Sequence, residues 1–568
     1  MTTTEWILFF FALQGVHFLG TWKLYKAAGF QAWQAAVPIY NAFILMKIIK
    51  RPAWWVILLF IPTINLILFG AILVETLRSF GKNSAKDTAL VLLTFGLYIY
   101  TVNYSANPKH QPDRSLRPKT GFGETVSSIL FAVVAATLVH NYFIQPYIIP
   151  TGSLEKSLLI GDFLFVSKFH YGARAPMTAV SVPMVHDTVP GLKIRSYLKK
   201  PQFPYLRLPG LQKINRNEIV VFSWPADTVR QFFVREKRVD KPIDKKSNYV
   251  KRCVGIPGDT LEIIDGFVHT NRSKNQLPDR ARVQYTHFAY AQKGVSSRKL
   301  LAEGFSDFNR TYKIDNITES SYQQIIPHII GRMGNTIEDF RVITTAKGLP
   351  TDVIRKTGLR VSEILELKKE MTLTLDEATA MRKVPEIDSV VRRFSKKNVP
   401  NEAFFPNKIP FDWNEDNFGP LVIPKKGMTV NLNKENLPLY KKIIAEYEAN
   451  DLETSPSEIR INGYPTDQYT FKKDYYWMMG DNRHKSEDSR FWGFVPDDHI
   501  VGKPIFIWFS IKGINDGIKN WSIRWDRVFT TVGGSGERTS YFPYFVGFLV
   551  VWQGVVFYRR RKKNKTAA

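Results

Sequence analysis

Long apolar runs lie near both ends of the chain, whereas the middle carries only short ones. About 20 apolar residues are needed to cross a membrane as a helix. The third of the long runs, TALVLLTFGLYIYTV, is short and bounded by polar residues, so it also fits an amphipathic element on the membrane surface. The pattern predicts a multi-span membrane protein. The candidate spans are residues 5–22, 54–75, 87–103, 125–145 and 541–558.

Basic residues beside these runs indicate their orientation, because short cytoplasmic loops are enriched in Lys and Arg. The loop that follows the first run contains Lys23, Lys26, Lys47, Lys50 and Arg51 and no acidic residue. The stretch before the fourth run and the tail at the end of the chain are also basic. Five spans with an external N-terminus satisfy all three observations. The region between the fourth and fifth runs is therefore predicted to lie outside the cytoplasm.

This exported region shows short alternating or apolar runs broken by Gly, Pro and Asn, which is typical of strands. Asp265-Gly266 and Asn462-Gly463 separate such runs and predict two-residue hairpin turns. We therefore expect a mainly β domain. The predicted strands lie in GDFLFVSKF, NEIVVFSWP, YVKRCVGIPGDTLEIIDGFVHTN, SEIRINGYPTDQYTFK, DYYWMMGDN and HIVGKPIFIWFS.

Residues 275–455 are more charged and in places helical, which indicates an insertion. Thr374 and Glu377 form a capping-box pattern ahead of EATAMRKV, and LPLYKKIIAEYEAN has apolar positions at helical spacing. The chain then divides into a membrane region with two or three spans, an anchor, an exported domain with its insertion, a last span and a basic tail. The respective ranges are 1–124, 125–147, 148–530, 541–558 and 559–568.

The net charge of the chain limits the classes of partner that it is expected to bind. The 78 Lys and Arg residues exceed the 51 Asp and Glu residues and give a net charge of +27. Such an excess fits nucleic acid, anionic lipid or solubility alone, and the apolar runs favour the lipid bilayer over nucleic acid. The single cysteine, Cys253, allows no intramolecular disulfide.

Two residues suggest chemistry. Ser153 lies in Pro-Thr-Gly-Ser directly after the fourth apolar run, and a serine nucleophile needs a base such as histidine or a lysine of lowered pKa. Lys251 lies in YVKRCVGIPGD, where strand alternation places it on the same face as Cys253, and burial there would lower its pKa. Taken singly, Ser153 also fits a turn or helix N-cap, and Lys251 a solvated strand residue.

Four phrases follow one another in the exported region: PTGS, IGDFLFVSKF, YVKRCVGIPGD and GDNRHKSEDSRFWGFVP. In order and wording they resemble the catalytic boxes of bacterial type I signal peptidases. The resemblance implies a Ser/Lys protease with the signal-peptidase-like β fold and no cofactor or metal. It also implies the bacterial inner (cytoplasmic) membrane, with the catalytic domain on the periplasmic or extracytoplasmic side.

The resemblance further implies residue roles. Ser153 would be the nucleophile, Lys251 the general base, and Ser486 the residue that orients the lysine amine, while the Thr151 hydroxyl and the Ser153 N–H would form the oxyanion hole. Asp488 and Arg490 would form a supporting ion pair. Small substrate side chains would bind against Ile149, Leu154, Leu158, Tyr249 and Val250, although ordinary core packing is an alternative for these, Leu158 above all.

The phrase around the nucleophile departs from the family pattern. Many members have methionine after the serine and proline two residues later, whereas Leu154, Glu155 and Lys156 follow Ser153 here. Leucine is a plausible apolar replacement. The Glu-Lys pair makes the geometry of this turn an open question.

The implied function is a membrane-bound serine endopeptidase that removes N-terminal signal peptides from exported preproteins after small residues, at Ala-X-Ala-like sites. Its partners would be preproteins, the lipid bilayer and the protein-export translocon. A self-cleaving repressor-type protease is disfavoured because the chain has spans instead of a DNA-binding module, and a metalloprotease because H-E-x-x-H is missing from the sequence. The remaining alternative is an inactive membrane scaffold or assembly factor with a protease-like domain.

Overall fold

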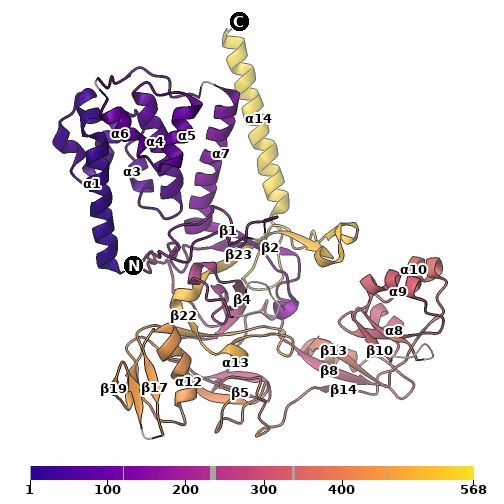
Figure 1. The fold of residues 1–568 in the computed structure, drawn as a ribbon. Helices are drawn as coiled ribbons and strands as arrows, with labels where there is room; N and C mark the ends of the chain where they lie inside the picture. Colours follow the sequence, from indigo (N-terminus) through magenta and orange to yellow (C-terminus); the bar gives the residue numbers. More distant parts are fainter. Residues whose placement is uncertain are drawn as a thin grey trace.

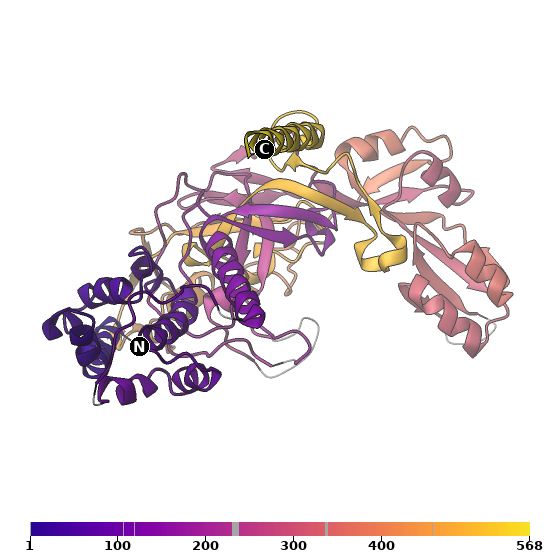
Figure 2. The ribbon, with the colours of Figure 1, turned by 90° about the horizontal axis from the view of Figure 1, so that it is seen from above.

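The computed structural model describes residues 2–105, 107–118, 120–192, 194–229, 238–334, 339–456 and 458–567. Figure 1 shows a helical bundle above a body of β-strands, with a long C-terminal helix standing beside the bundle. Figure 2, seen from above, shows the bundle on one side of the β body and the inserted region projecting on the other. The β body therefore lies between the two.

Three helices in the described residues are long and apolar enough to cross a membrane: Thr3–Ala27, Gly121–Phe143 and Phe542–Arg559. They coincide with the first, fourth and fifth predicted spans. The C-terminal helix continues through the predicted basic tail. The helices of the bundle and the C-terminus are α1 (Thr3–Ala27), α2 (Tyr40–Ile48), α3 (Trp55–Leu58), α4 (Ile64–Ser79), α5 (Ala85–Leu93), α6 (Tyr98–Asn103), α7 (Gly121–Leu138), which continues into a π-helical turn (Val139–Phe143), and α14 (Phe542–Ala567).

The second and third predicted spans, 54–75 and 87–103, differ from the expectation because neither forms one continuous helix. The second is broken between α3 and α4 at Thr63, which follows a proline and has φ 71°. The third is broken between α5 and α6 at Gly96, with φ 92°. The Tyr98 hydroxyl donates to Asp87 Oδ1 at 2.8 Å and so connects the start of α6 with the start of α5.

The β body is built on an antiparallel sheet, as the exported region predicted. Its strand order is β1-β2-β23-β3-β4-β21-β22. One side of the sheet packs on a cluster that includes Leu164 and Val221, and the other on a cluster that includes Val220 and Cys253. The strands are β1 (Ile144–Ile148), β2 (Asp162–Ser167), β3 (Ile219–Ser223), β4 (Asn248–Gly255), β21 (Tyr475–Met479), β22 (Val495–Pro496) and β23 (Ile500–Lys512), with β24 (Ser522–Ile523) and β25 (Thr530–Thr531) paired to β23.

Both predicted hairpin turns are confirmed. Strands β5 (Thr260–Ile264) and β6 (Phe267–Thr270) pair around Asp265-Gly266, and β18 (Ile459–Ile461) and β19 (Tyr464–Pro465) pair around Asn462-Gly463. All four turn residues have positive φ, which the primed hairpin turns require.

The region predicted as one insertion, 275–455, contains two structural parts. The first holds helices α8–α11 and two small sheets, ordered β13-β8-β14 and β10-β11-β9-β12. Helix α11 begins with the predicted capping box of Thr374 and Glu377. The bounds of this part are β8 (Gln284–Tyr290), α8 (Ser297–Ala302), β9 (Asn309–Ile314), α9 (Glu319–Ile325), β10 (Gly331–Met333), β11 (Arg341–Thr345), α10 (Thr351–Thr357), β12 (Val361–Glu363), β13 (Lys368–Thr374), α11 (Leu375–Met381) and β14 (Ser389–Arg392).

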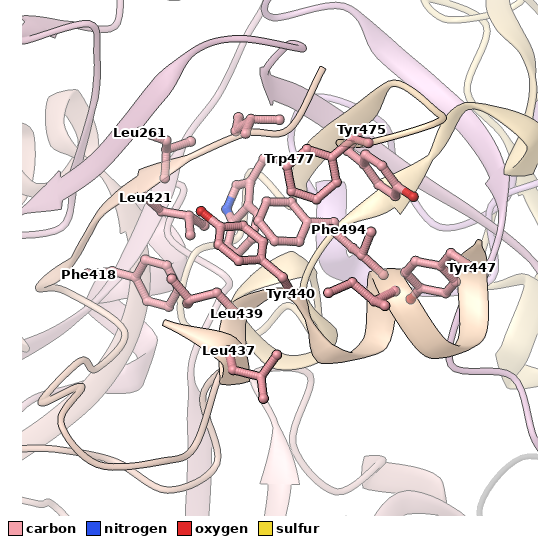
Figure 3. Close-up of a cluster of buried hydrophobic side chains, with 14 of the residues drawn as sticks. Leu261, Phe418, Leu421, Leu437, Leu439, Tyr440, Tyr447, Tyr475, Trp477 and Phe494 are labelled. Carbon is pink, nitrogen blue, oxygen red and sulfur yellow. The ribbon is translucent and has the colours of Figure 1, made fainter. Parts of the chain in front are cut away.

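The second part belongs to the β body, because β15 (Phe418–Val422) pairs with β5. The predicted helix in LPLYKKIIAEYEAN is present as α12 (Leu437–Lys442) and a π-helical turn (Ile443–Tyr447). Figure 3 shows side chains of this helix packed toward Phe418, Trp477 and Phe494. The remaining strands are β7 (Ser273–Lys274), β16 (Thr429–Asn431), β17 (Leu452–Thr454) and β20 (Gln468–Thr470).

Candidate active site

The predicted nucleophile lies on a short turn after β1. Ser153 is in a 3₁₀ turn, Gly152–Leu154, and does not begin an α-helix. The backbone N–H of Asn482 donates to the Ser153 carbonyl oxygen at 3.1 Å, and Asn482 Nδ2 donates to the Gly152 carbonyl oxygen at 3.2 Å. The loop after β21 therefore fixes the turn that carries Ser153.

The predicted base lies on β4, which is paired with β3 through Lys251 and Val220. Lys251 is 4% exposed, and its ammonium lies 5.6 Å from the centre of the Tyr249 ring. Burial lowers the pKa of Lys251 to about 8, against the opposing effect of the Asp488 and Glu487 carboxylates. With this pKa about a tenth of Lys251 is neutral at pH 7, which is far more than for an ordinary lysine.

Ser153 and Lys251 line one cleft of about 1060 Å³. The cleft also includes most of the residues that were expected to bind substrate or the oxyanion. Leu158 is the exception, because its side chain is fully buried in the core cluster with Leu164 and Val166 and does not line the cleft. The other predicted residues on the cleft wall are Ile149, Thr151, Leu154, Tyr249 and Val250.

Ser486 lies behind the cleft and is 5% exposed. Within the described part of the chain, its Oγ has no hydrogen-bond partner. Gly480 separates Ser486 from the nucleophile turn: a Cβ built at position 480 would lie 2.2 Å from Ser486 Oγ and 2.6 Å from the Ser153 carbonyl oxygen. The close approach of these two serines therefore requires glycine at position 480.

Asp488 and Arg490 form the expected ion pair, and both side chains are almost completely buried. Arg490 Nε lies 2.9 Å from Asp488 Oδ1, and Arg490 Nη2 lies 2.9 Å from Oδ2. Burial alone would raise the pKa of Asp488, but the guanidinium of Arg490 keeps it below its usual range. Asp488 Oδ2 also accepts from the Gly480 N–H at 3.0 Å. The pair thus holds the glycine that lies between the serines.

A second buried ion pair was not predicted. Arg252 Nη2 lies 2.5 Å from Asp481 Oδ2, and the Ser157 hydroxyl donates to the same oxygen at 2.5 Å. The pair connects β4 with the chain that follows Ser153. Sequence reasoning also missed Gly480 and Asn482. The available signals were an arginine inside an apolar strand phrase and the Gly-Asp-Asn sequence that opens the most specific phrase.

The unusual Glu155-Lys156 pair contacts the insertion. Lys156 Nζ lies 2.5 Å from Glu377 Oε2 and donates to the Thr372 carbonyl oxygen at 3.2 Å. Residues 304–307 and Glu377 of the insertion line the same cleft as Ser153. Burial raises the pKa of Glu155. The departure from the family pattern thus connects the turn that carries Ser153 with an inserted wall of the cleft.

Two histidines of the exported region, His484 and His170, make contacts outside the cleft. His484 Nε2 lies 3.1 Å from Asp416 Oδ1, and His170 Nδ1 lies 2.5 Å from Ser167 Oγ. No histidine is found among the described residues that line the cleft. Three or more His, Cys, Asp or Glu side chains grouped for metal binding are likewise not found in the described ranges.

Comparison with protein families gives two matches. Residues 122–338 and 420–509, together more than half of the chain, match the family described as signal peptidase, peptidase S26. The segment that this match skips is shorter than the predicted insertion. Residues 33–112, which include α2 to α6, match a family of unknown function, DUF5684.

Curated relatives agree with the first match. Signal peptidase I of Buchnera aphidicola subsp. Acyrthosiphon pisum is 24% identical over 392 residues, which cover 69% of this chain and 76% of the relative. Signal peptidase I of Haemophilus influenzae is 25% identical over 421 residues, covering 73% and 78%. Signal peptidase I of Helicobacter pylori is 38% identical over 84 residues, covering 13% and 29%.

Proposed function

The chain belongs to the peptidase S26 family of signal peptidases, and on this premise we propose that it uses Ser153 and Lys251 to remove signal peptides from exported preproteins after small residues. The observation that carries the proposal is the single cleft shared by Ser153 and Lys251, with Lys251 buried and its pKa lowered to about 8. A serine endopeptidase of this kind needs both a nucleophile and a base that is neutral at working pH.

The reaction follows from the protonation state of Lys251. The neutral amine accepts the proton of the Ser153 hydroxyl while Oγ attacks the scissile carbonyl carbon. The resulting ammonium returns that proton to the leaving amine nitrogen, and an acyl-enzyme ester remains. Water then attacks the ester, with the Lys251 amine again accepting the proton, and Ser153 is regenerated. The buried hydroxyl of Ser486 is available to orient the amine.

Two groups are suited to stabilise the oxyanion. Thr151 and Ser153 flank Gly152 on the cleft wall, and the proposal assigns the Thr151 hydroxyl and the Ser153 N–H as donors to the developing negative charge. Loss of one such donor typically costs about 2.7–4 kcal/mol of transition-state stabilisation. The apolar wall of Ile149, Leu154 and Val250 supports a preference for small side chains before the scissile bond.

Contacts between the bundle and the β body support the proposed placement in the bacterial inner membrane. Trp6, at the start of α1, donates from Nε1 to the Gln202 carbonyl oxygen at 2.9 Å, and Thr63, before α4, lies 3.4 Å from Ser181. These ends of the bundle therefore face the catalytic domain. Arg51 and Arg114 form ion pairs with Glu75 near the opposite end of α4. Basic residues beside a span favour the cytoplasmic side of the membrane, so this end of the bundle is assigned to that side.

The placement has a direct test. The proposed orientation leaves the N-terminus and the catalytic domain outside the cytoplasm, where the translocon delivers preproteins. A reporter fused after residue 120 or at residue 568 should be cytoplasmic, and one inserted near residue 330 should be external. A cytoplasmic reporter at residue 330 would contradict the placement.

The activity is tested with purified full-length protein and a preprotein. The wild type should release the signal peptide, and sequencing of the product should place the new N-terminus after a small residue. Ser153→Ala should remain folded and membrane-bound but produce no cleavage. Equal cleavage by Ser153→Ala would remove the nucleophile assignment, and no cleavage by the wild type would favour the inactive scaffold.

A further inference from the structure

A second lysine, Lys168, lies partly buried where the helix α7 reaches the β body. Figure 1 shows the lower end of α7 directly above β1. The Lys168 N–H donates to the Phe143 carbonyl oxygen at 2.8 Å, so the residue after β2 is fixed to the end of the apolar helix. Lys168 lines a cavity of about 150 Å³. The charged residues of this cavity differ from those of the Ser153 cleft. The proposed peptidase mechanism does not use this lysine.

The cavity has an excess of positive charge. Lys168, Arg174 and Lys245 line it, and Asp244 is the one acidic residue among the described residues of its wall. Asp244 is already engaged, because its oxygens accept from the backbone N–H groups of Met177 and Thr178 and from the Thr178 hydroxyl. The cavity therefore offers cationic groups without a free carboxylate.

Lys168 in particular has no counter-ion among the described residues. Burial, together with the nearby guanidinium groups of Arg174 and Arg207, lowers its pKa to about 7. Arg174 is held in place by donating to the Asp498 carbonyl oxygen at 2.8 Å and to Ser223 Oγ at 3.2 Å. An anion in the cavity would stabilise the charged form of Lys168.

An independent observation points to a ligand. Thr137, on the last turn of α7, lines the cavity and is 3% exposed. Its hydroxyl has no hydrogen-bond partner within the described residues. Buried hydroxyls are normally paired, so an unpaired one on the wall of a polar cavity indicates an acceptor supplied from outside the chain.

We propose that this cavity binds the phosphate group of a membrane phospholipid, with Lys168 as the cationic partner and Thr137 as a hydrogen-bond donor. Basic pockets beside transmembrane helices are suited to lipid head groups. The end of the apolar helix Gly121–Phe143 lies at head-group depth if α7 spans the bilayer. The neighbouring Val182 and Met184 line the cavity and are 45% and 51% exposed, which gives the acyl chains an apolar surface.

The site has a consequence for catalysis. Tyr147 and Asn248 line both this cavity and the Ser153 cleft, and their side chains lie 3.3 Å apart. A bound head group would therefore hold the shared wall at the membrane surface. The inference rests on the proposed membrane placement of α7 and is independent of the cleavage reaction, so a binding measurement distinguishes the two.

The test uses delipidated full-length protein in dodecyl maltoside, with its melting temperature followed by intrinsic fluorescence. The additions are dihexanoyl phosphatidylglycerol, dihexanoylglycerol with the same chains and no phosphate, and inorganic phosphate. We expect a saturable rise in melting temperature with the phospholipid, none with dihexanoylglycerol, and half-saturation by inorganic phosphate only at concentrations at least about tenfold higher.

Variants locate the effect. Lys168→Met should weaken the phospholipid response at least about tenfold, and Thr137→Val about fivefold, as expected for one charged and one neutral hydrogen bond. Lys213→Met, which replaces an exposed lysine outside the cavity, is the matched control and should respond as the wild type.

Each outcome bears on the proposal. An unchanged response in both Lys168→Met and Thr137→Val, or no response in the wild type, would overturn it. An equal response to dihexanoylglycerol would show binding through the chains alone and would also overturn it. Equal potency of inorganic phosphate would retain the phosphate site and overturn the lipid source. If Lys168→Met does not fold, Thr137→Val and the three wild-type titrations decide.

Discussion

Lys251 and Lys168 both belong to the β body, and both have a lowered pKa, about 8 and about 7 respectively. Their neighbours differ. Lys251 lies near the carboxylates of Asp488 and Glu487 and shares a cleft with a serine hydroxyl. Lys168 lies near guanidinium groups and lines the same cavity as Thr137, whose hydroxyl has no partner among the described residues.

This difference shows that a lowered pKa does not by itself assign a role to a lysine. Carboxylates near Lys251 oppose the effect of burial, so the amine can both hold and release a proton near neutral pH. The arginines near Lys168 act in the same direction as burial, so its charged form needs an external anion. The first environment suits a general base and the second an anion site.

The largest expected effect is the loss of cleavage activity when Lys251 is replaced. Lys251→Met should lower kcat/KM by about 10⁴-fold or more, because the nucleophile and base act as one unit. Lys251→Arg should be equally inactive, since a guanidinium cannot be deprotonated in the useful range. Initial rates of preprotein cleavage measure the effect, with Lys213→Met as the control. More than a tenth of wild-type activity in folded Lys251→Met would contradict the assignment.

The next largest effect concerns Gly480, which lies between Ser486 and the turn that carries Ser153. Gly480→Ala should lower kcat/KM by about 10²-fold, because the added Cβ would force Ser486 and the Ser153 carbonyl apart, and misplacement by about 1 Å has this order of cost. Gly533→Ala is the control, because Gly533 is exposed, has no positive φ, and has no atom near the added Cβ. Unfolding in denaturant shows whether the fold survives. Wild-type kinetics in Gly480→Ala would show that Ser486 does not act on the dyad.

A smaller effect appears in the pH dependence. The pKa of Lys251 is lowered to about 8, so the fraction of neutral base falls about tenfold per pH unit well below that value. We expect kcat/KM to rise with pH and to level off above about 8. His170→Asn and His484→Asn should leave this acid limb in place. If the acid limb lies near pH 6.5 and disappears in one histidine variant, that histidine and not Lys251 is the base.

The sequence predicted the parts of the fold that depend on short-range patterns. The Asp-Gly and Asn-Gly hairpins and the cap at Thr374 follow from local backbone preferences. Ser153 and Lys251 were found because each lies in a distinctive phrase, and the structure places both in one cleft. Their roles remain predictions that the proposed experiments address.

The parts that the sequence missed depend on contacts between distant segments. Apolar composition alone did not show that residues 54–75 and 87–103 break at Thr63 and Gly96. Residues 418–422, inside the predicted insertion, pair as β15 with β5, which is far away in the chain. Gly480 has a role only because Ser486 and the nucleophile turn approach it from two sides. Thr137 and Lys168 meet only in the folded protein.

The smallest expected effect tests whether the insertion acts on the Lys251 site. The ion pair of Lys156 and Glu377 joins the nucleophile turn to α11, and its side chains are 22% and 37% exposed. Partly exposed pairs contribute at most about 1 kcal/mol. A double-mutant cycle with Lys156→Met and Glu377→Gln should therefore give a coupling of about twofold to fivefold in kcat/KM.

A second ion pair provides the matched control for this cycle. Lys347 and Asp516 also join the insertion to the β body, at 2.8 Å, but their side chains are 67% and 48% exposed and neither lines the cleft. Their cycle should show no coupling in kcat/KM. If both cycles give the same coupling, the insertion affects the protein through general stability. If only the Lys156–Glu377 cycle is coupled, the inserted wall positions the turn that carries Ser153, and the Glu155-Lys156 departure from the family pattern has a function in catalysis.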